Sequence, residues 1–365
     1  MENTLKRQAN IELLRVVAML MIIGSHLALH GIQADMGAWN AGNRINRIFT
    51  SMLKPGGGVG VAVFFIITGW FNGNKERISV KRTTLTTVFY GFVCGLIGIL
   101  GLVKGLNPVS ADSAKNLVRC FFSPVMGGGW WFVTAYILLA LIAPTINRYV
   151  AKMNNREVAL LVAGFWFFEY TVGNIISNQY FLIQRATMFY LIGVCLKKYN
   201  KYPNKRGLFL LGSGMAYCLH GMIQYASDSV IARGKSGILD EIIIIVTSCL
   251  SNSVLIIIEA VLLFLFFLQI TIDSRKILEV GKSVFGVYLL HDSIFTRNLI
   301  WHKIVKAEKI YEMRAYPVIT ILVIGGVFLS CYIVERIRIK YFEGIMEETA
   351  NRCVQFIRCF GNKIL

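Results

Sequence analysis

Long apolar stretches separated by short polar ones recur along the whole chain. Each stretch is long enough to cross the roughly 30 Å hydrocarbon core of a bilayer as a helix. We predict about ten such spans, at residues 11–30, 56–72, 84–103, 130–147, 158–176, 180–196, 207–225, 253–271, 281–300 and 316–335. The expected fold class is all-α, a polytopic membrane helical bundle. Its transmembrane domain covers 1–340 and is followed by a cytoplasmic C-terminal tail, 341–365.

Positive charge is concentrated in alternate loops between these stretches. The loops after the second, fourth, sixth and eighth spans are short and rich in Lys and Arg, as cytoplasmic loops are. Both termini are therefore expected to face the cytoplasm. The run at 238–250 is apolar but short for a span, and Asp240 and Glu241 lie at its start. We expect a re-entrant or surface helix there, because a crossing would invert the later topology.

Composition agrees with a membrane protein. Of the 365 residues 55% are hydrophobic, and the mean hydropathy is +0.59, which is far above that of soluble domains. The net charge of +18 lies in loop clusters, so no nucleic-acid partner is expected. The eight cysteines form no CxxC pair and have no histidine at ligand spacing, so we expect buried thiols and no metal site. The first helix has basic residues before it, as a signal peptide does, but no cleavage site follows, so it should stay as an anchor.

The first apolar helix carries three ionisable residues, Glu12, Arg15 and His26. Such residues are costly in a membrane and usually face the protein interior, where they mark function. Arg15 and His26 are eleven positions apart, which places them within about 20° on a helix and roughly 16 Å apart. Both should face one interior. The alternative is an arginine that reaches the headgroups and an interfacial histidine.

Sorting polar residues by depth along the predicted spans gives two layers. The inner layer contains Glu12, Arg15, Arg82 and Glu335, and the outer layer contains His26, Glu169, Arg185, Glu259, His291 and Asp292. Arginines suit an anionic ligand because the guanidinium group binds phosphate through two hydrogen bonds. A histidine suits proton transfer. Glu169 and Glu259 could instead form structural ion pairs with Arg185. His220 and His302 are placed near helix ends and receive no role.

Two glycine clusters, KPGGGVG at 54–60 and MGGGWW at 126–131, lie at ends of predicted helices. They permit tight turns and close backbone approach, and Trp130 and Trp131 can anchor at the membrane interface. A flexible loop is the alternative for both clusters.

Six segments resemble, in order, those of acyltransferase family 3, integral membrane O-acyltransferases of cell-surface polysaccharides. They read IELLRVVAMLMIIGSH at 11–26, FFIITGWF at 64–71, GGGWWFVTAYILLALIAP at 127–144, RATMFYLIG at 185–193, GKSVFGVYLLHD at 281–292 and LSCYIVER at 329–336. Glu12 stands where the family usually has Asp, and Thr68 where it has Ser. The second arginine of the family's R-x-x-R is absent after Arg82, and so is the proline usual after the final glutamate.

The resemblance implies transfer of an acyl group, commonly acetyl, from cytoplasmic acyl-CoA to a hydroxyl of a surface polysaccharide or its lipid-linked precursor. The expected location is the bacterial cytoplasmic membrane, as a multi-pass protein. Acyl-CoA is then a co-substrate, no cofactor is permanently bound, and the partners are the lipid bilayer, acyl-CoA and a sugar acceptor, with a homodimer as an option. The phosphates of coenzyme A would meet the inner basic layer.

The resulting hypothesis makes His26 the general base, with direct transfer and an acyl-histidine intermediate both open. Arg15 joins it in the catalytic set and binds the donor together with Lys81, Arg82 and Glu335. Glu335 or Glu12 would pair with Arg15. The acceptor or tunnel set is Glu169, Arg185, Glu259, Ser283, Tyr288, His291 and Trp131. A transporter or flippase for lipid-linked sugars is the main alternative, although it predicts half-repeats and broken helices, and a membrane sensor or scaffold is the third.

Overall fold

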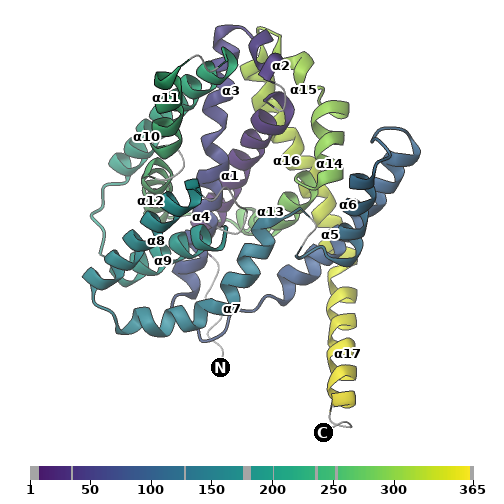
Figure 1. Cartoon of the computed structure of the whole chain (residues 1–365). Coiled ribbons are helices and arrows are strands. Elements are labelled where there is room, and N and C mark those ends of the chain that lie inside the picture. Colours follow the sequence, from purple (N-terminus) through teal and green to yellow (C-terminus); the bar gives the residue numbers. More distant parts are fainter. Residues whose placement is uncertain are drawn as a thin grey trace.

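The computed structural model describes residues 8–33, 36–126, 129–175, 182–199, 201–234, 237–250 and 254–361. Within these ranges every regular element is a helix, and most of the helices stand side by side in one bundle (Figure 1). This confirms the all-α membrane bundle. The elements are α1 (Ala9–His26), η1 (Leu27–Ile32), α2 (Met36–Ala41), α3 (Arg44–Leu53), α4 (Pro55–Asn72), α5 (Lys81–Val103), α6 (Ala111–Phe122), α7 (Trp131–Lys152), α8 (Asn155–Ile175), α9 (Leu182–Tyr199), α10 (Arg206–Ala232), α11 (Ile238–Cys249), α12 (Leu255–Leu268), α13 (Arg275–His291), α14 (Ile294–Asn298), η4 (Leu299–Ile304), α15 (Ala307–Tyr311), α16 (Tyr316–Tyr341) and α17 (Glu343–Gly361).

Each of the ten predicted spans overlaps a helix, and residues 176, 180, 181 and 253 of these spans lie outside the described residues. Five helical stretches of the described chain are both long and apolar enough to cross a membrane: Ala9–Ile32, Arg44–Asn72, Lys81–Val103, Trp131–Lys152 and Tyr316–Tyr341. The other five predicted spans overlap α8, α9, α10, α12 and α13, which do not meet that combined length and apolarity. These five helices are packed against other helices of the bundle.

The connection through α11 begins and ends on one side of the bundle. The start of α10 lies beside the end of α12, where the side-chain amide of Gln269 donates to the Pro203 carbonyl at 2.9 Å. The opposite ends of α10 and α12 therefore share the other side, and α11 joins them there (Figure 1). The expectation that 238–250 does not cross is consistent with this arrangement.

Helix α1 is the central element of the core. Its residues Ile11, Leu14 and Ala18 are buried in a hydrophobic cluster with residues of α4, α7, α9 and α12. Its residues Met19 and Ile22 belong to a second cluster, shared with α5, α13, α15 and α16. Because α1 is covered on both sides, its polar side chains are held against protein neighbours.

Close backbone approach joins α4 to α1 and α9. A Cβ atom added to Gly69 would lie 2.0 Å from the Tyr190 carbonyl oxygen, and one added to Gly193 would lie 2.1 Å from the Ile66 carbonyl oxygen. Likewise Gly56 faces the Met21 carbonyl of α1. Small residues permit such contacts between membrane helices. The cluster at 54–60 is thus mostly the helical start of α4, and the flexible-loop alternative is wrong there.

Helix α13 ends earlier than the predicted span 281–300. The chain turns at Asp292 and Ser293, and the extended backbone of Ser293 precedes the short helix α14. The backbone N–H of Asp292 donates to the Tyr288 carbonyl and closes the last turn. The sequence shows only an apolar run interrupted by a polar pair, so the turn could not be placed by hydropathy. As a result His291 and Asp292 lie at a helix end inside the bundle.

Candidate active site

His26 lies where α1 changes from α-helical to π-helical geometry. The π-helical segment η1 follows it directly, and the Gln33 backbone N–H bonds to the Ala28 carbonyl five residues earlier. The wider turn brings His30 next to His26, with their ring centroids 5.3 Å apart. Such π-helical turns are frequent at functional sites. This local geometry directs both imidazoles toward α13.

Hydrogen bonds assign the tautomer of His26. The Nδ1 atom of His291 lies 2.8 Å from the Val287 carbonyl oxygen, which only accepts, so Nδ1 of His291 carries the proton. In a neutral His291 ring the Nε2 atom is then an acceptor, and it lies 3.0 Å from Nδ1 of His26. His26 must donate from Nδ1. Its Nε2 atom therefore keeps a free lone pair.

Asp292 gives His26 a negatively charged neighbour. Its Oδ1 atom lies 3.4 Å from Nδ1 of His26 and accepts a hydrogen bond from Arg297 at 2.8 Å. The carboxylate is buried, so water screens it little. A carboxylate on the Nδ1 side holds the ring and stabilises the imidazolium that forms when Nε2 takes a proton. The arrangement is suited to general base catalysis.

His26 opens onto an outer cavity of about 440 Å³. Three members of the predicted tunnel set, Arg185, Trp131 and Tyr288, line it. The other polar lining residues include Lys54, His30, His220, Gln224 and Asp292. The cavity is thus polar on several sides, and a hydroxyl-bearing ligand would find donors and acceptors there.

Two ion pairs at this cavity were not predicted. Lys54 is held by Asp228, with Nζ and Oδ1 2.6 Å apart, and Ser51 and Gln33 also donate to the same carboxylate. The predicted span 207–225 stopped before Asp228, and Lys54 looked like a loop residue. The sequence signal that could have found this pair is that Lys54 and Asp228 are charged residues next to apolar runs.

The second pair joins His220 and Glu259, whose Nδ1 and Oε1 atoms are 3.0 Å apart. His220 lies in the middle of α10, so its placement near a helix end was wrong, because α10 continues to Ala232. Glu259 thus has a histidine partner, which the expected pairing with Arg185 did not include. The side chain of Glu169 lies outside the part of the chain that the structure describes.

An inner cavity of about 260 Å³ lies nearer the start of α1. Its cationic residues are Arg15, Arg82, Lys282 and Arg338. Arg15 pairs with Glu12, Nη1 to Oε1 at 2.8 Å, and Arg82 pairs with Glu343 of α17 at 2.8 Å. Four positive charges around one cavity favour an anionic ligand.

Glu335 lines this cavity but does not pair with Arg15. Its carboxylate accepts hydrogen bonds from Arg338 at 2.7 and 2.8 Å and from the Tyr90 hydroxyl at 2.7 Å. A Cβ atom added to Gly286 would lie 2.2 Å from the Glu335 carboxylate, so this glycine makes room for the group. Of the two partners expected for Arg15, Glu12 is the one observed.

Several predicted site residues do not line either of these cavities. Lys81 donates to the Asn351 side chain of α17 at 2.6 Å. Ser283 is buried and lies near a carbonyl of its own helix, His291 lies behind His26, and Glu259 lies behind His220. These residues were expected to bind the donor or the acceptor, but their side chains do not border either cavity.

The two cavities adjoin. Ile22, Val61, Phe132 and Tyr288 line both of them, so the inner arginines and the outer histidine are separated by a thin layer of shared side chains. Arg15 and His26 both face the interior, as their spacing predicted. The one interior expected for them is thus divided into two cavities that meet at this layer.

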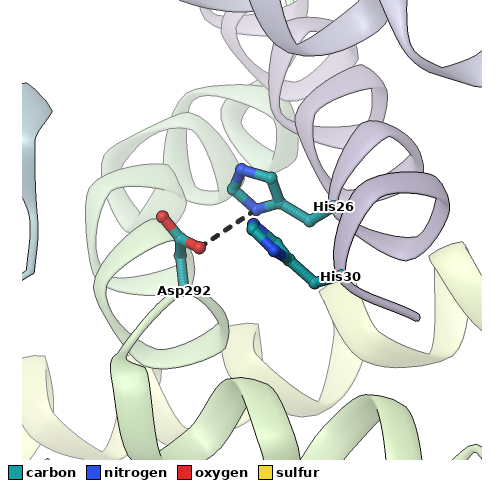
Figure 2. A group of neighbouring side chains, drawn as sticks. All are labelled: His26, His30 and Asp292. Atoms are coloured by element: carbon teal, nitrogen blue, oxygen red, sulfur yellow. Dashed lines mark ion pairs between the residues drawn. The ribbon is translucent and has the colours of Figure 1, made fainter. Parts of the chain in front are cut away.

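One group could hold a metal ion. The ligand atoms of His26, His30 and Asp292 all lie within 4.8 Å of one another, and Figure 2 shows the two imidazoles and the carboxylate converging. Two histidines and one carboxylate are a donor set that zinc accepts. Arg297 already neutralises Asp292, which opposes a second cation. The absence of a metal site stays a prediction.

The cysteines agree with the sequence analysis in part. Those at positions 94, 120, 195, 218 and 331 are free thiols. Three are buried and Cys195 is half-buried, whereas Cys218 is exposed on α10. Burial was expected for all of them, and at Cys218 this was wrong because an apolar run does not reveal which face of its helix is covered.

Comparison with known families identifies the class. Two adjoining cavities, one arginine-rich and one lined by His26, suit the transfer of a group within a membrane. The acyltransferase family 3 model, described as an acyltransferase domain, matches residues 8–336. The chain belongs to this family and is a membrane acyltransferase. Comparisons with curated proteins and with solved structures found no match.

Proposed function

We propose that the protein is an O-acyltransferase of the bacterial cytoplasmic membrane. It takes an acyl group, in the first instance acetyl, from cytoplasmic acyl-CoA and transfers it to a hydroxyl of a cell-surface polysaccharide or its lipid-linked precursor. The observation that carries this proposal is the free Nε2 lone pair of His26 in a cavity adjoining an arginine-lined one.

Charge supports the assignment of the donor to the inner cavity. Coenzyme A carries several phosphate groups, and Arg15, Arg82 and Arg338 line that cavity. Guanidinium groups bind phosphate through paired hydrogen bonds and stay charged at all relevant pH values. The thioester would then reach the shared layer beneath His26.

The outer cavity supplies the base for the acceptor. Nε2 of His26 takes the proton as the acceptor oxygen attacks the thioester carbon. The C–S bond then breaks, and the released thiolate takes a proton to give free CoA. In a variant of this route His26 itself carries the acyl group, because the same Nε2 atom is nucleophilic. Either route requires the neutral His26 ring.

The direct test is the replacement of His26 by alanine. A general base contributes about 10²- to 10⁴-fold to a rate, so His26→Ala should lose almost all CoA release from acetyl-CoA in native membrane vesicles. The matched control is His302→Ala, since His302 pairs with Glu308 away from both cavities. O-acetyl content of surface glycans should follow the same order. Wild-type transfer by His26→Ala would overturn the assignment.

A further inference from the structure

Tyr288 occupies the junction of the two cavities. Four side chains line both cavities, and the other three, Ile22, Val61 and Phe132, are apolar. The Tyr288 hydroxyl is therefore the one polar side-chain group that the described lining of both cavities shares. A group transferred from the inner to the outer cavity must pass it.

The hydroxyl is buried and has no established hydrogen-bond partner. Tyr288 is 6% exposed, and its oxygen makes no hydrogen bond of ordinary geometry within the described chain, although the Asp292 carboxylate and the Phe132 backbone lie near it. A buried polar group left without a partner costs about 1–3 kcal/mol. A ligand oxygen at the junction would remove this cost.

The ring itself is firmly placed. Tyr288 precedes His291 by three residues on α13, which puts both side chains on one helical face. Its ring meets the Phe132 ring edge to face at 5.7 Å and the His291 ring at 6.2 Å. The same helix turn thus fixes the Tyr288 hydroxyl and, through His291, the base His26. A donor held by a packed ring needs little reorganisation during a reaction.

We propose that Tyr288 is a catalytic residue that donates a hydrogen bond to the thioester carbonyl oxygen of the acyl donor. When the acceptor oxygen forms its bond to the carbonyl carbon, the C=O pair moves to oxygen, and the Tyr288 O–H stabilises that negative charge. The proton of the acceptor goes to Nε2 of His26. The charge returns as the C–S bond breaks and thiolate leaves. Tyr288 keeps its proton throughout, so the step needs no further reactant.

This inference rests on the proposed acyl transfer and is tested by Tyr288→Phe. The substitution removes one oxygen and keeps the ring. Loss of one oxyanion donor lowers kcat by about 10²- to 10³-fold, so kcat for CoA release from acetyl-CoA should fall by that factor, while KM for acetyl-CoA changes less than about threefold. Thermal stability should change little, because the removed hydroxyl makes no hydrogen bond of ordinary geometry within the described chain.

The matched control is Tyr311→Phe. The Tyr311 hydroxyl is buried and donates to the Trp39 carbonyl at 2.8 Å, away from both cavities. Its loss should lower the thermal midpoint and leave kcat unchanged, which is the reverse of the Tyr288→Phe result. A Tyr288→Phe protein with wild-type kcat would overturn the inference, and so would one whose kcat loss is matched by lost stability.

The two proposals fail in different ways. If wild-type protein releases no CoA and His26→Ala changes nothing, acyl transfer at this site is wrong. If wild-type protein is active, His26→Ala is inactive and Tyr288→Phe retains full kcat, then only the role of Tyr288 is wrong.

Discussion

At the residue scale, the proposed role of His26 as the base depends on an ordered set of neighbours. Val287 fixes the tautomer of His291, which in turn accepts from Nδ1 of His26. Asp292 supplies the charge beside the same nitrogen. The free Nε2 atom is therefore a consequence of three contacts whose partner residues Val287, His291 and Asp292 all lie on α13 or at its end.

Asp292→Asn removes the charge beside His26 and keeps the size of the side chain, so it tests the charge apart from packing. An asparagine amide can present N–H to Nδ1 of His26 and favour the wrong tautomer, which in a comparable dyad costs up to about 10⁴-fold in kcat. Because His291 still accepts from Nδ1, we expect a loss nearer to about 10²-fold in CoA release. The control is Asp112→Asn at the exposed start of α6. Unchanged kcat in Asp292→Asn would show that the carboxylate does not support His26.

At the scale of elements, α17 places a carboxylate beside two arginines of the inner cavity. This helix lies beyond the family match, which ends at residue 336. It projects from the end of the bundle at which α1 begins (Figure 1). Glu343 at its start pairs with Arg82 at 2.8 Å and lies 3.9 Å from Arg338, and both arginines line the inner cavity. The carboxylate thus competes with any anion for these cations.

Glu343→Gln should therefore tighten donor binding. Partly exposed ion pairs are worth about 0.2–1 kcal/mol, so KM for acetyl-CoA should fall by about 1.4- to fivefold with kcat preserved. The control is Glu348→Gln, whose carboxylate pairs with Arg352 on α17 itself. A higher KM in Glu343→Gln would mean that the carboxylate helps to position the arginines.

The close contact between α4 and α9 should not tolerate a larger side chain. An added methyl group at Gly193 meets the Ile66 carbonyl at 2.1 Å, so Gly193→Ala should separate the helices at a cost of about 1–3 kcal/mol. Gly325→Ala in α16 is the control, because nothing lies within 4 Å of its added Cβ atom. Thermal unfolding in lipid nanodiscs should show a lower midpoint for the first variant alone. Equal midpoints would contradict the close approach.

At the scale of the whole molecule, the bundle places two chemical environments along one path. The arginines come from α1, α5 and α16, and the histidines that line the outer cavity come from α1, η1 and α10. Helix α1 contributes to both environments, since Arg15 and His26 lie on one face of it. The two cavities meet in the bundle interior at side chains from α1, α4, α7 and α13.

The sequence by itself determined the helical membrane class, the ten apolar segments and the inward-facing residues of α1, because hydropathy and helical periodicity are local properties. Only the tertiary structure decided that the Tyr90 hydroxyl meets Glu335, that Lys54 meets Asp228, and that His291 fixes the His26 tautomer. Each of those contacts joins residues from different helices or helix ends, so it depends on how the helices pack and on where α13 ends. No pattern within one segment carries that information.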